Sequence, residues 1–163
     1  MRVLGVDPGL NVTGVAVMES EGGEPRLVWA RAIRPPARVP LPERLRHLRD
    51  ALVDLARDSG ATEAAVEEVF IGVDPRAALR LGAAQAACLL ALADAGISVH
   101  LYTSTRVKQT IAGHGRADKR QVRAMLRARL APGAVLSPID ASDAAAVAAC
   151  HLLWSAVLPL VPP

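Results

Sequence analysis

Four acidic residues stand where the sequence pattern can gather them around one point. Asp7 ends an apolar segment near the N-terminus, and Glu67 lies near the end of the apolar segment 64–70. Asp140 and Asp143 open the last helical segment, and their spacing of three residues puts them on one helical face. Judged singly, each acid also fits a structural role, as a turn residue, a solvated strand residue or a helix cap. Judged together, they would repel one another unless cations or protons held them.

The chemistry that such a group favours is metal-dependent hydrolysis of a phosphodiester. Carboxylate oxygens suit Mg²⁺ or Mn²⁺. Two such ions about 4 Å apart bind both the attacking water and the leaving oxygen, so no protein nucleophile is needed. The sequence contains no phosphate-binding loop of the P-loop type. Cys88 and Cys150 lie far apart in apolar segments without zinc-ligand spacing, so we expect them to be core residues.

Basic residues are concentrated in the segment 106–129, which contains a single acid, Asp118. The basic residues of this segment are Arg106, Lys108, Arg116, Lys119, Arg120, Arg123, Arg127 and Arg129. In the helix expected at 118–130, three arginines recur at helical spacing and form a stripe suited to phosphate contacts, or an ordinary solvated face. These arginines are Arg120, Arg123 and Arg127.

Lys119 differs from the arginine stripe because its helical position falls beside Val122 and Leu126, the apolar side of the same helix. We therefore expect Lys119 to point inward. An inward lysine near clustered acids is a candidate partner for the scissile phosphate.

Other candidates for contact with nucleic acid lie in loops. Phe70, the only phenylalanine, follows Glu67 at the start of a loop, where a base could stack on it or where it could serve as a core aromatic. His114 lies between two glycines and could contact phosphate or fill the loop, with Arg116 beside it. We interpret His100 and His151 as structural.

The elements that position these residues alternate between strand and helix. Pro8, Gly9 and Asn11 reverse the chain between the first two strands and predict a hairpin. Because a helix between two strands normally makes a right-handed crossover, the fourth strand can lie parallel to the first, which brings Asp7 and Glu67 to one sheet edge. The order predicts an α/β fold, a mixed five-stranded sheet with helices on both faces. The expected strands are 2–7, 12–19, 26–34, 64–70 and 97–102. One helix is expected to end near Gly60, and four more are expected at 76–95, 106–111, 118–130 and 140–156.

Composition indicates one soluble domain spanning 1–163. The chain of 163 residues is 52% hydrophobic, yet no apolar run approaches the roughly 20 residues of a membrane span. The opening residues are too short for a signal peptide, so we expect a cytoplasmic protein without a membrane partner. The segment 76–95 is apolar on every side, which predicts packing on the sheet on one side and on a second subunit on the other.

The chain resembles the RuvC family of Holliday-junction resolvases, whose fold is that of ribonuclease H. The resemblance covers nearly the whole chain. It rests on GVDPGLNVTGVAV at 5–17, VEEVFIG at 66–72, VKQTIAGHGRADKRQV at 107–122 and DASDAAAVAACH at 140–151.

The resemblance implies a homodimer that binds a four-way DNA junction and makes paired symmetric nicks during recombination and repair. It further implies RuvA and RuvB, the branch-migration proteins, as partners. By match of motif it assigns metal binding, with two Mg²⁺ or Mn²⁺ ions per site, to Asp7, Glu67, Asp140 and Asp143. It assigns positions near DNA to Lys108 and Lys119. The chain departs from the family pattern in the dimer helix, where GAAQAA replaces GQARG, and at Ser142, where alanine is frequent.

Three alternatives stay open. One is a nuclease of the same fold that acts on RNA hybrids or on pre-ribosomal RNA. Another is an ATP-binding domain of the actin and sugar-kinase type, although 163 residues are too few for its two lobes. The last is a non-catalytic junction-binding protein. The basic segment and the set of acids favour the junction nuclease.

Overall fold

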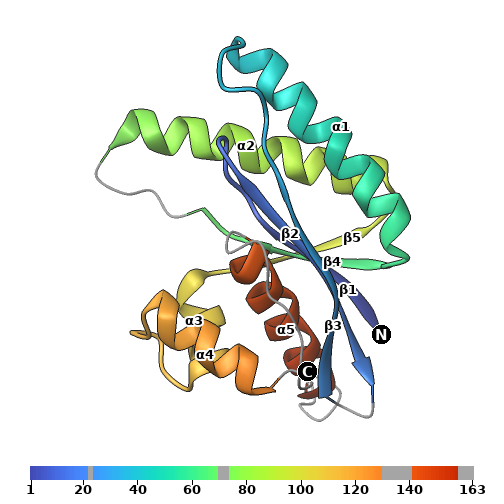
Figure 1. The fold of residues 1–163 in the computed structure, drawn as a ribbon, viewed down its shortest axis with the longest axis vertical. Coiled ribbons are helices and arrows are strands. Elements are labelled where there is room, and N and C mark those ends of the chain that lie inside the picture. The colour runs from blue at the N-terminus through green and yellow to red at the C-terminus, as the bar shows by residue number, and fades with distance from the viewer. Residues whose placement is uncertain (22–23, 70–73, 130–140, 158–163) are drawn as a thin grey trace, which may run out of the picture.

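The computed structural model describes residues 1–21, 24–69, 74–129 and 141–157 (Figure 1). Its centre is a five-stranded sheet of order β3-β2-β1-β4-β5. The strands are β1 (Arg2–Asp7), β2 (Thr13–Glu21), β3 (Glu24–Ile33), β4 (Glu63–Glu67) and β5 (Ser98–Tyr102). The pairs β1–β2 and β2–β3 are antiparallel, whereas β1–β4 and β4–β5 are parallel. The predicted mixed sheet, with the fourth strand beside the first, is therefore confirmed.

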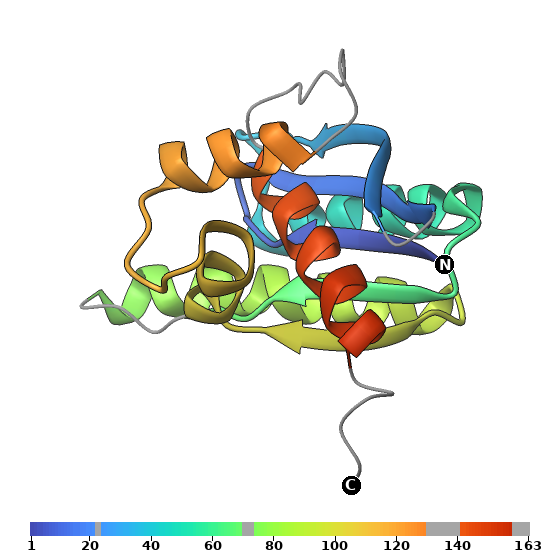
Figure 2. The same cartoon turned by 90° about the horizontal axis from the view of Figure 1, so that it is seen from below.

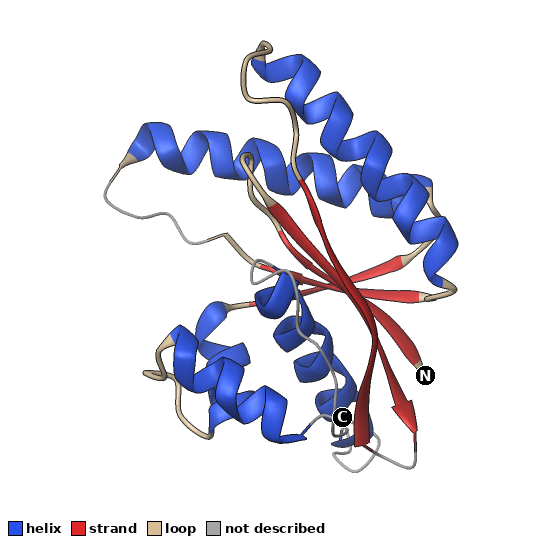
Figure 3. Ribbon diagram, viewed as in Figure 1, coloured by secondary structure: helices blue, strands red, loops and turns tan. Residues whose placement is uncertain are grey.

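Helices cover both faces of the sheet, as predicted. The helices are α1 (Leu41–Ser59), α2 (Pro75–Asp94), α3 (Ser104–Ala112), α4 (Lys119–Arg129) and α5 (Ala141–Val157). Figure 3 shows α1 and α2 on one side of the strands and α3, α4 and α5 on the other. Alternate residues of each strand supply the two cores, with Leu4 and Val6 facing α1 and α2 and with Val3 facing α5.

One close contact sets the position of α5 on the sheet. A Cβ atom at Gly5 would lie 2.0 Å from the carbonyl oxygen of Ala144 and 2.8 Å from the Cβ of Ala148. Only glycine on the strand and alanine on the helix allow the two backbones to come this close. Figure 2 shows α5 crossing the strands directly. Asp143, next to Ala144, is thereby held near the carboxyl end of β1.

The helix α2 packs on α1 but leaves much of its apolar surface uncovered. Its buried residues are Ala84, Ala87, Cys88, Ala91 and Leu92. Leu79 and Leu90 are strongly exposed. By length and composition α2 could cross a membrane, but core helices of soluble proteins pass the same test, and α2 carries Arg76 and Arg80. Both cysteines are buried, as predicted, and neither is in a disulfide.

Candidate active site

The carboxyl ends of β1 and β4 bring Asp7 and Glu67 together. Val6 pairs with Val66 in the parallel ladder, so the residues that follow them lie side by side at one edge of the sheet. Both acids lie on the α5 side because strand residues alternate in direction and Val3 and Ala65 belong to the core under α5. The expected meeting of these two strand acids therefore follows from the observed register.

A cavity of about 40 Å³ opens at this edge. Its lining residues are Glu67, Ser104, Val107, Lys108, Lys119, Val122, Asp143 and Ala146. They come from β4, α3, α4 and α5, four elements that are distant in sequence. Acidic and basic side chains face one another across the cavity, and the cavity has room for water or a metal ion.

Two basic side chains of α4 hold Asp143. The Nζ of Lys119 donates a hydrogen bond to Oδ2 of Asp143 at 2.6 Å. The Nη2 of Arg123 lies 3.8 Å from Oδ1. The Asp143 side chain is 14% exposed, and its carboxylate raises the pKa of Lys119 through this hydrogen bond. The Lys119 ammonium thus already places a positive charge against the acid.

The prediction that Lys119 points inward is wrong. Its side chain is 70% exposed, while Val122 and Leu126 are buried. The ammonium group nevertheless reaches Asp143, in keeping with the expectation that this lysine lies near the clustered acids. Helical position gives the direction in which a side chain leaves the helix, but not where the end of a long side chain lies.

Glu67 is a carboxyl group partly withdrawn from water. Burial raises the pKa of Glu67, and the negative charge of Asp143 raises it further. A hydrogen bond with Ser104 and the charges of Lys119 and Lys108 act on the pKa of Glu67 in the opposite direction. Sequence reasoning missed Ser104. Its only signal is that it opens α3, after Thr103 caps that helix at the same sheet edge.

This donor set fits a hard divalent cation. Glu67 and Asp143 supply carboxylate oxygens, and Asp7 is close enough for its charge to raise the pKa of Lys119 as theirs do. A cation between the carboxylates would offset their mutual repulsion. Oxygen-rich sites of this kind suit Mg²⁺ or Mn²⁺. Asp140, the fourth predicted ligand, lies outside the described residues.

The predicted nucleic-acid contacts divide into two groups. Lys108 lines the cavity beside Glu67, and Arg123 is drawn toward Asp143, with a side chain 23% exposed. Arg123 therefore departs from the predicted arginine stripe. The side chains that lie on the surface are His114, Arg116, Arg120 and Arg127. Phe70 lies outside the described residues.

Curated proteins similar to this chain share one description. Residues 3–151 match the family described as crossover junction endodeoxyribonuclease RuvC. A protein of that description from Chloroflexus aggregans is 47% identical over 151 residues, which cover 93% of this chain and 92% of that protein. One from Bordetella petrii is 44% identical over 151 residues, covering 93% and 82% of the two chains.

Solved structures show the same fold. The Thermus thermophilus RuvC structure aligns with a TM-score of 0.85 at 31% identity, covering 96% of each chain. The structure of T. thermophilus RuvC in complex with Holliday junction substrate aligns with a TM-score of 0.87 at 30% identity, covering 95% of this chain and 94% of that one. The yeast mitochondrial Holliday junction resolvase Ydc2, at 12% identity and a TM-score of 0.71, shows the fold alone. The expected ribonuclease H-like fold is confirmed, and the chain belongs to the RuvC family of crossover junction endodeoxyribonucleases.

Proposed function

We propose that this protein is an endonuclease that resolves Holliday junctions, and that it hydrolyses the phosphodiester at the cavity between Glu67 and Asp143. The observation that carries this proposal is the meeting of acidic and basic side chains from four elements around one small cavity. The family membership supports the junction as substrate, because a similar protein has been solved in complex with Holliday junction substrate.

The metal ligands in this proposal are Asp7, Glu67, Asp140 and Asp143, holding two Mg²⁺ or Mn²⁺ ions. When bound, such ions activate water and stabilise charge on the leaving oxygen. The chain itself orients the ligands. Lys119 and Arg123 hold Asp143, and the hydrogen bond with Ser104 holds Glu67.

Basic side chains bind the DNA strand in this proposal. Lys108 and Lys119 reach the cavity, where their ammonium groups can bind non-bridging oxygens of the scissile phosphate. The exposed side chains of His114, Arg116, Arg120 and Arg127 would contact the sugar-phosphate backbone farther along the strand, and these contacts would make junction affinity depend on salt. Phe70 stays a candidate for stacking on a base.

A homodimer would supply the second cut. Leu79 and Leu90 of α2 are exposed, and an apolar groove runs between α1 and α2. The groove is lined by Leu45, Arg46, Arg49, Ala83, Ala86, Ala87, Leu90 and Asp94. A second copy of the chain packed there would cover this surface, and a twofold axis would place two active sites on a four-way junction. From the family we also propose that the protein acts in the cytoplasm with RuvA and RuvB, in recombination and repair.

The experiment that tests this function is cleavage of a labelled four-way DNA junction beside a linear duplex and an RNA–DNA hybrid. Each substrate is incubated with Mg²⁺, with Mn²⁺ or with a chelator. We expect paired symmetric nicks in the junction that disappear with the chelator. Preferential cutting of the hybrid would support the rival nuclease, and binding without cutting would leave a junction-recognition protein.

A further inference from the structure

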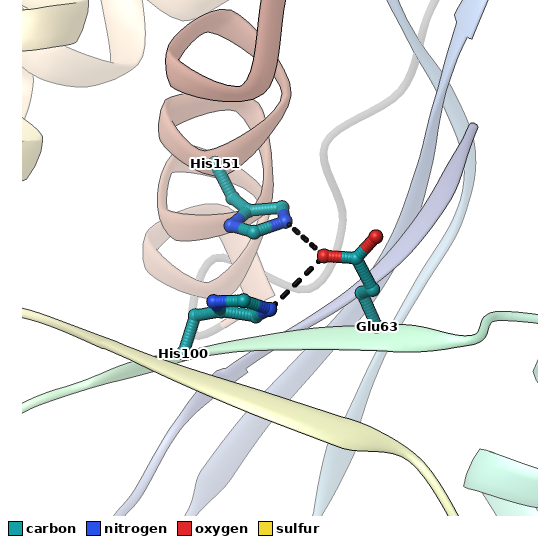
Figure 4. A group of neighbouring side chains, drawn as sticks. All are labelled: Glu63, His100 and His151. Atoms are coloured by element: carbon teal, nitrogen blue, oxygen red, sulfur yellow. Dashed lines mark hydrogen bonds and ion pairs between the residues drawn. The ribbon is translucent and has the colours of Figure 1, made fainter. Parts of the chain in front are cut away.

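A second group of polar side chains lies at the opposite end of β4 (Figure 4). Glu63 opens β4, His100 belongs to β5 and His151 to α5. The Oε2 of Glu63 lies 3.0 Å from Nε2 of His100 and 3.0 Å from Nε2 of His151. The two imidazole rings have centroids 4.5 Å apart. Three distant parts of the chain therefore point one ligand atom each at a common centre.

The separations within this group match those of metal ligands. Zinc binds nitrogen and carboxylate oxygen at about 2.0–2.2 Å, so ligands of a tetrahedral site lie about 3.4 Å apart. The candidate ligand atoms of Glu63, His100 and His151 all lie within 4.8 Å of one another.

The surroundings of His151 hold its ring in a metal-binding orientation. The hydroxyl oxygen of Tyr102 lies 2.7 Å from Nδ1 of His151. When Nε2 of a histidine binds a metal, Nδ1 keeps its proton and donates it to such an oxygen, which fixes the ring and its tautomer. The Oγ of Ser155 lies 3.4 Å from Nε2, the nitrogen that faces Glu63.

One of the three ligands is buried and the other two are partly exposed, an arrangement that lets an ion enter from solvent. The His151 side chain is 3% exposed and fixed in the core, whereas His100 and Glu63 reach solvent. Burial lowers the pKa of His151, which favours the neutral imidazole, the form in which nitrogen binds metals. Unlike the carboxylate group around Glu67 and Asp143, this group combines two imidazole nitrogens with a single carboxylate oxygen.

We propose that Glu63, His100 and His151 bind a transition-metal ion of the Zn²⁺ class, with water as the remaining ligand. Two imidazoles and one carboxylate favour Zn²⁺ over Mg²⁺, because imidazole suits zinc, nickel and copper whereas magnesium selects oxygen. This proposal does not rest on the nuclease function. The bound ion would tie α5 to β4 and β5 and would stabilise the folded chain by an amount that grows with the logarithm of the free metal concentration once that concentration exceeds the Kd.

The test starts from full-length protein stripped of transition metals and kept in excess Mg²⁺. Co²⁺ is added as a spectroscopic probe, and Zn²⁺ is then added as a competitor. We compare wild type with His100→Ala, which removes a ligand at the surface, and with Glu63→Gln. His47→Ala is the matched control, since His47 is an exposed histidine of α1. Asp143→Asn separates this site from the carboxylate cavity.

We expect wild type to bind one Co²⁺ with a visible spectrum that Zn²⁺ removes. Tyr102→Phe removes only an outer hydrogen bond and should weaken Co²⁺ binding about tenfold. His100→Ala and Glu63→Gln each remove a ligand and should weaken Co²⁺ binding more than that. His47→Ala and Asp143→Asn should bind as wild type does. Equal binding by wild type and His100→Ala, loss of binding in Asp143→Asn, or failure of wild type to bind would overturn the proposal. These measurements of metal binding do not depend on junction cleavage. A protein that failed to cleave junctions could therefore still confirm or contradict this metal site.

A second readout does not depend on spectroscopy. Zn²⁺ should raise the thermal unfolding temperature of wild type and of His47→Ala in the presence of excess Mg²⁺, and should not raise that of His100→Ala. An equal rise in all three proteins would place zinc elsewhere and contradict the site.

Discussion

The strand β4 carries an acid at each end, and the two ends have different neighbours. Glu63 and Glu67 are four residues apart and lie on the same face, beneath α5. At the carboxyl end, Glu67 meets a second carboxylate, Asp143, and the ammonium of Lys119. At the amino end, Glu63 meets two imidazoles.

If both proposals hold, one strand face carries two kinds of site. The residues that β5, α4 and α5 supply decide which kind forms at each end. Oxygen ligands balanced by basic side chains suit Mg²⁺ and a phosphate, whereas nitrogen ligands suit Zn²⁺. Because α5 contributes Asp143 to one end and His151 to the other, its contact with the sheet supports both.

The largest expected effect is on junction cleavage, and it comes from a substitution at the carboxyl end of β4. Asp143→Asn should lower junction cleavage by more than about 100-fold, beyond the range found for outer partners of metal ligands, and should leave junction binding largely intact. Single-turnover cleavage and a binding titration in Ca²⁺ check both quantities. Asp54→Asn, an exposed acid of α1, is the control and should cleave as wild type does. Retained cleavage by Asp143→Asn would remove this residue from the mechanism.

The contact that supports both ends can be tested at Gly5. Gly5→Ala puts a methyl group 2.0 Å from the carbonyl oxygen of Ala144, so α5 must move. We expect a loss of about 1–3 kcal/mol of unfolding free energy, seen as a fall in unfolding temperature, with reduced cleavage as well. Gly82→Ala is the matched control, because among the described residues no atom outside the adjoining part of α2 lies within 4 Å of the added carbon. Wild-type stability in Gly5→Ala would contradict the observed packing.

Two arginines of α4 give a smaller, more specific contrast. Arg123 contacts Asp143, whereas the Arg120 side chain is 92% exposed. Arg123→Ala should lower cleavage by about 10- to 100-fold at saturating junction. Arg120→Ala should instead weaken junction binding and reduce the slope of log affinity against log salt by about 1. The same response from both variants would mean that Arg123 serves only as a DNA contact.

The smallest expected effect is a pH dependence at the amino end. Because burial lowers the pKa of His151 below its usual 6.5, the unfolded chain takes up this proton at a higher pH than the folded chain. The contribution of His151 to stability is thus fully present above about pH 6.5 and is lost as the pH falls toward the folded pKa. Glu63, His100 and Tyr102 face the ring; Glu63 raises the pKa of His151, and the charge of His100 lowers it.

Urea unfolding in chelator at a series of pH values measures this component. His151→Gln should flatten the dependence of unfolding free energy on pH in the acid range, and His47→Ala should keep it. A stability that is independent of pH in wild type would show that His151 does not titrate as its burial requires.

Much of the carboxyl-end site could be predicted because it depends on local rules. Turn residues at Pro8 and Gly9 fix the hairpin, and the crossover rule places β4 beside β1. Asp7 and Glu67 then meet by register. The spacing of Asp143 within a helix directs it to the sheet.

The rest could not be predicted because it depends on where side chains end. His151 and Glu63 are 88 residues apart in sequence, and nothing local links them. Arg123 shares helical spacing with Arg120, yet packing turns it toward Asp143. Ser104 contacts Glu67 only because β5 delivers α3 to the same edge.

Anomalous diffraction from crystals grown in Mn²⁺ would test the central claim most directly. We expect Mn²⁺ at the carboxyl end of β4, at coordination distance from the carboxylates of Glu67 and Asp143. Mn²⁺ found at Glu63, His100 and His151, and none between Glu67 and Asp143, would contradict it.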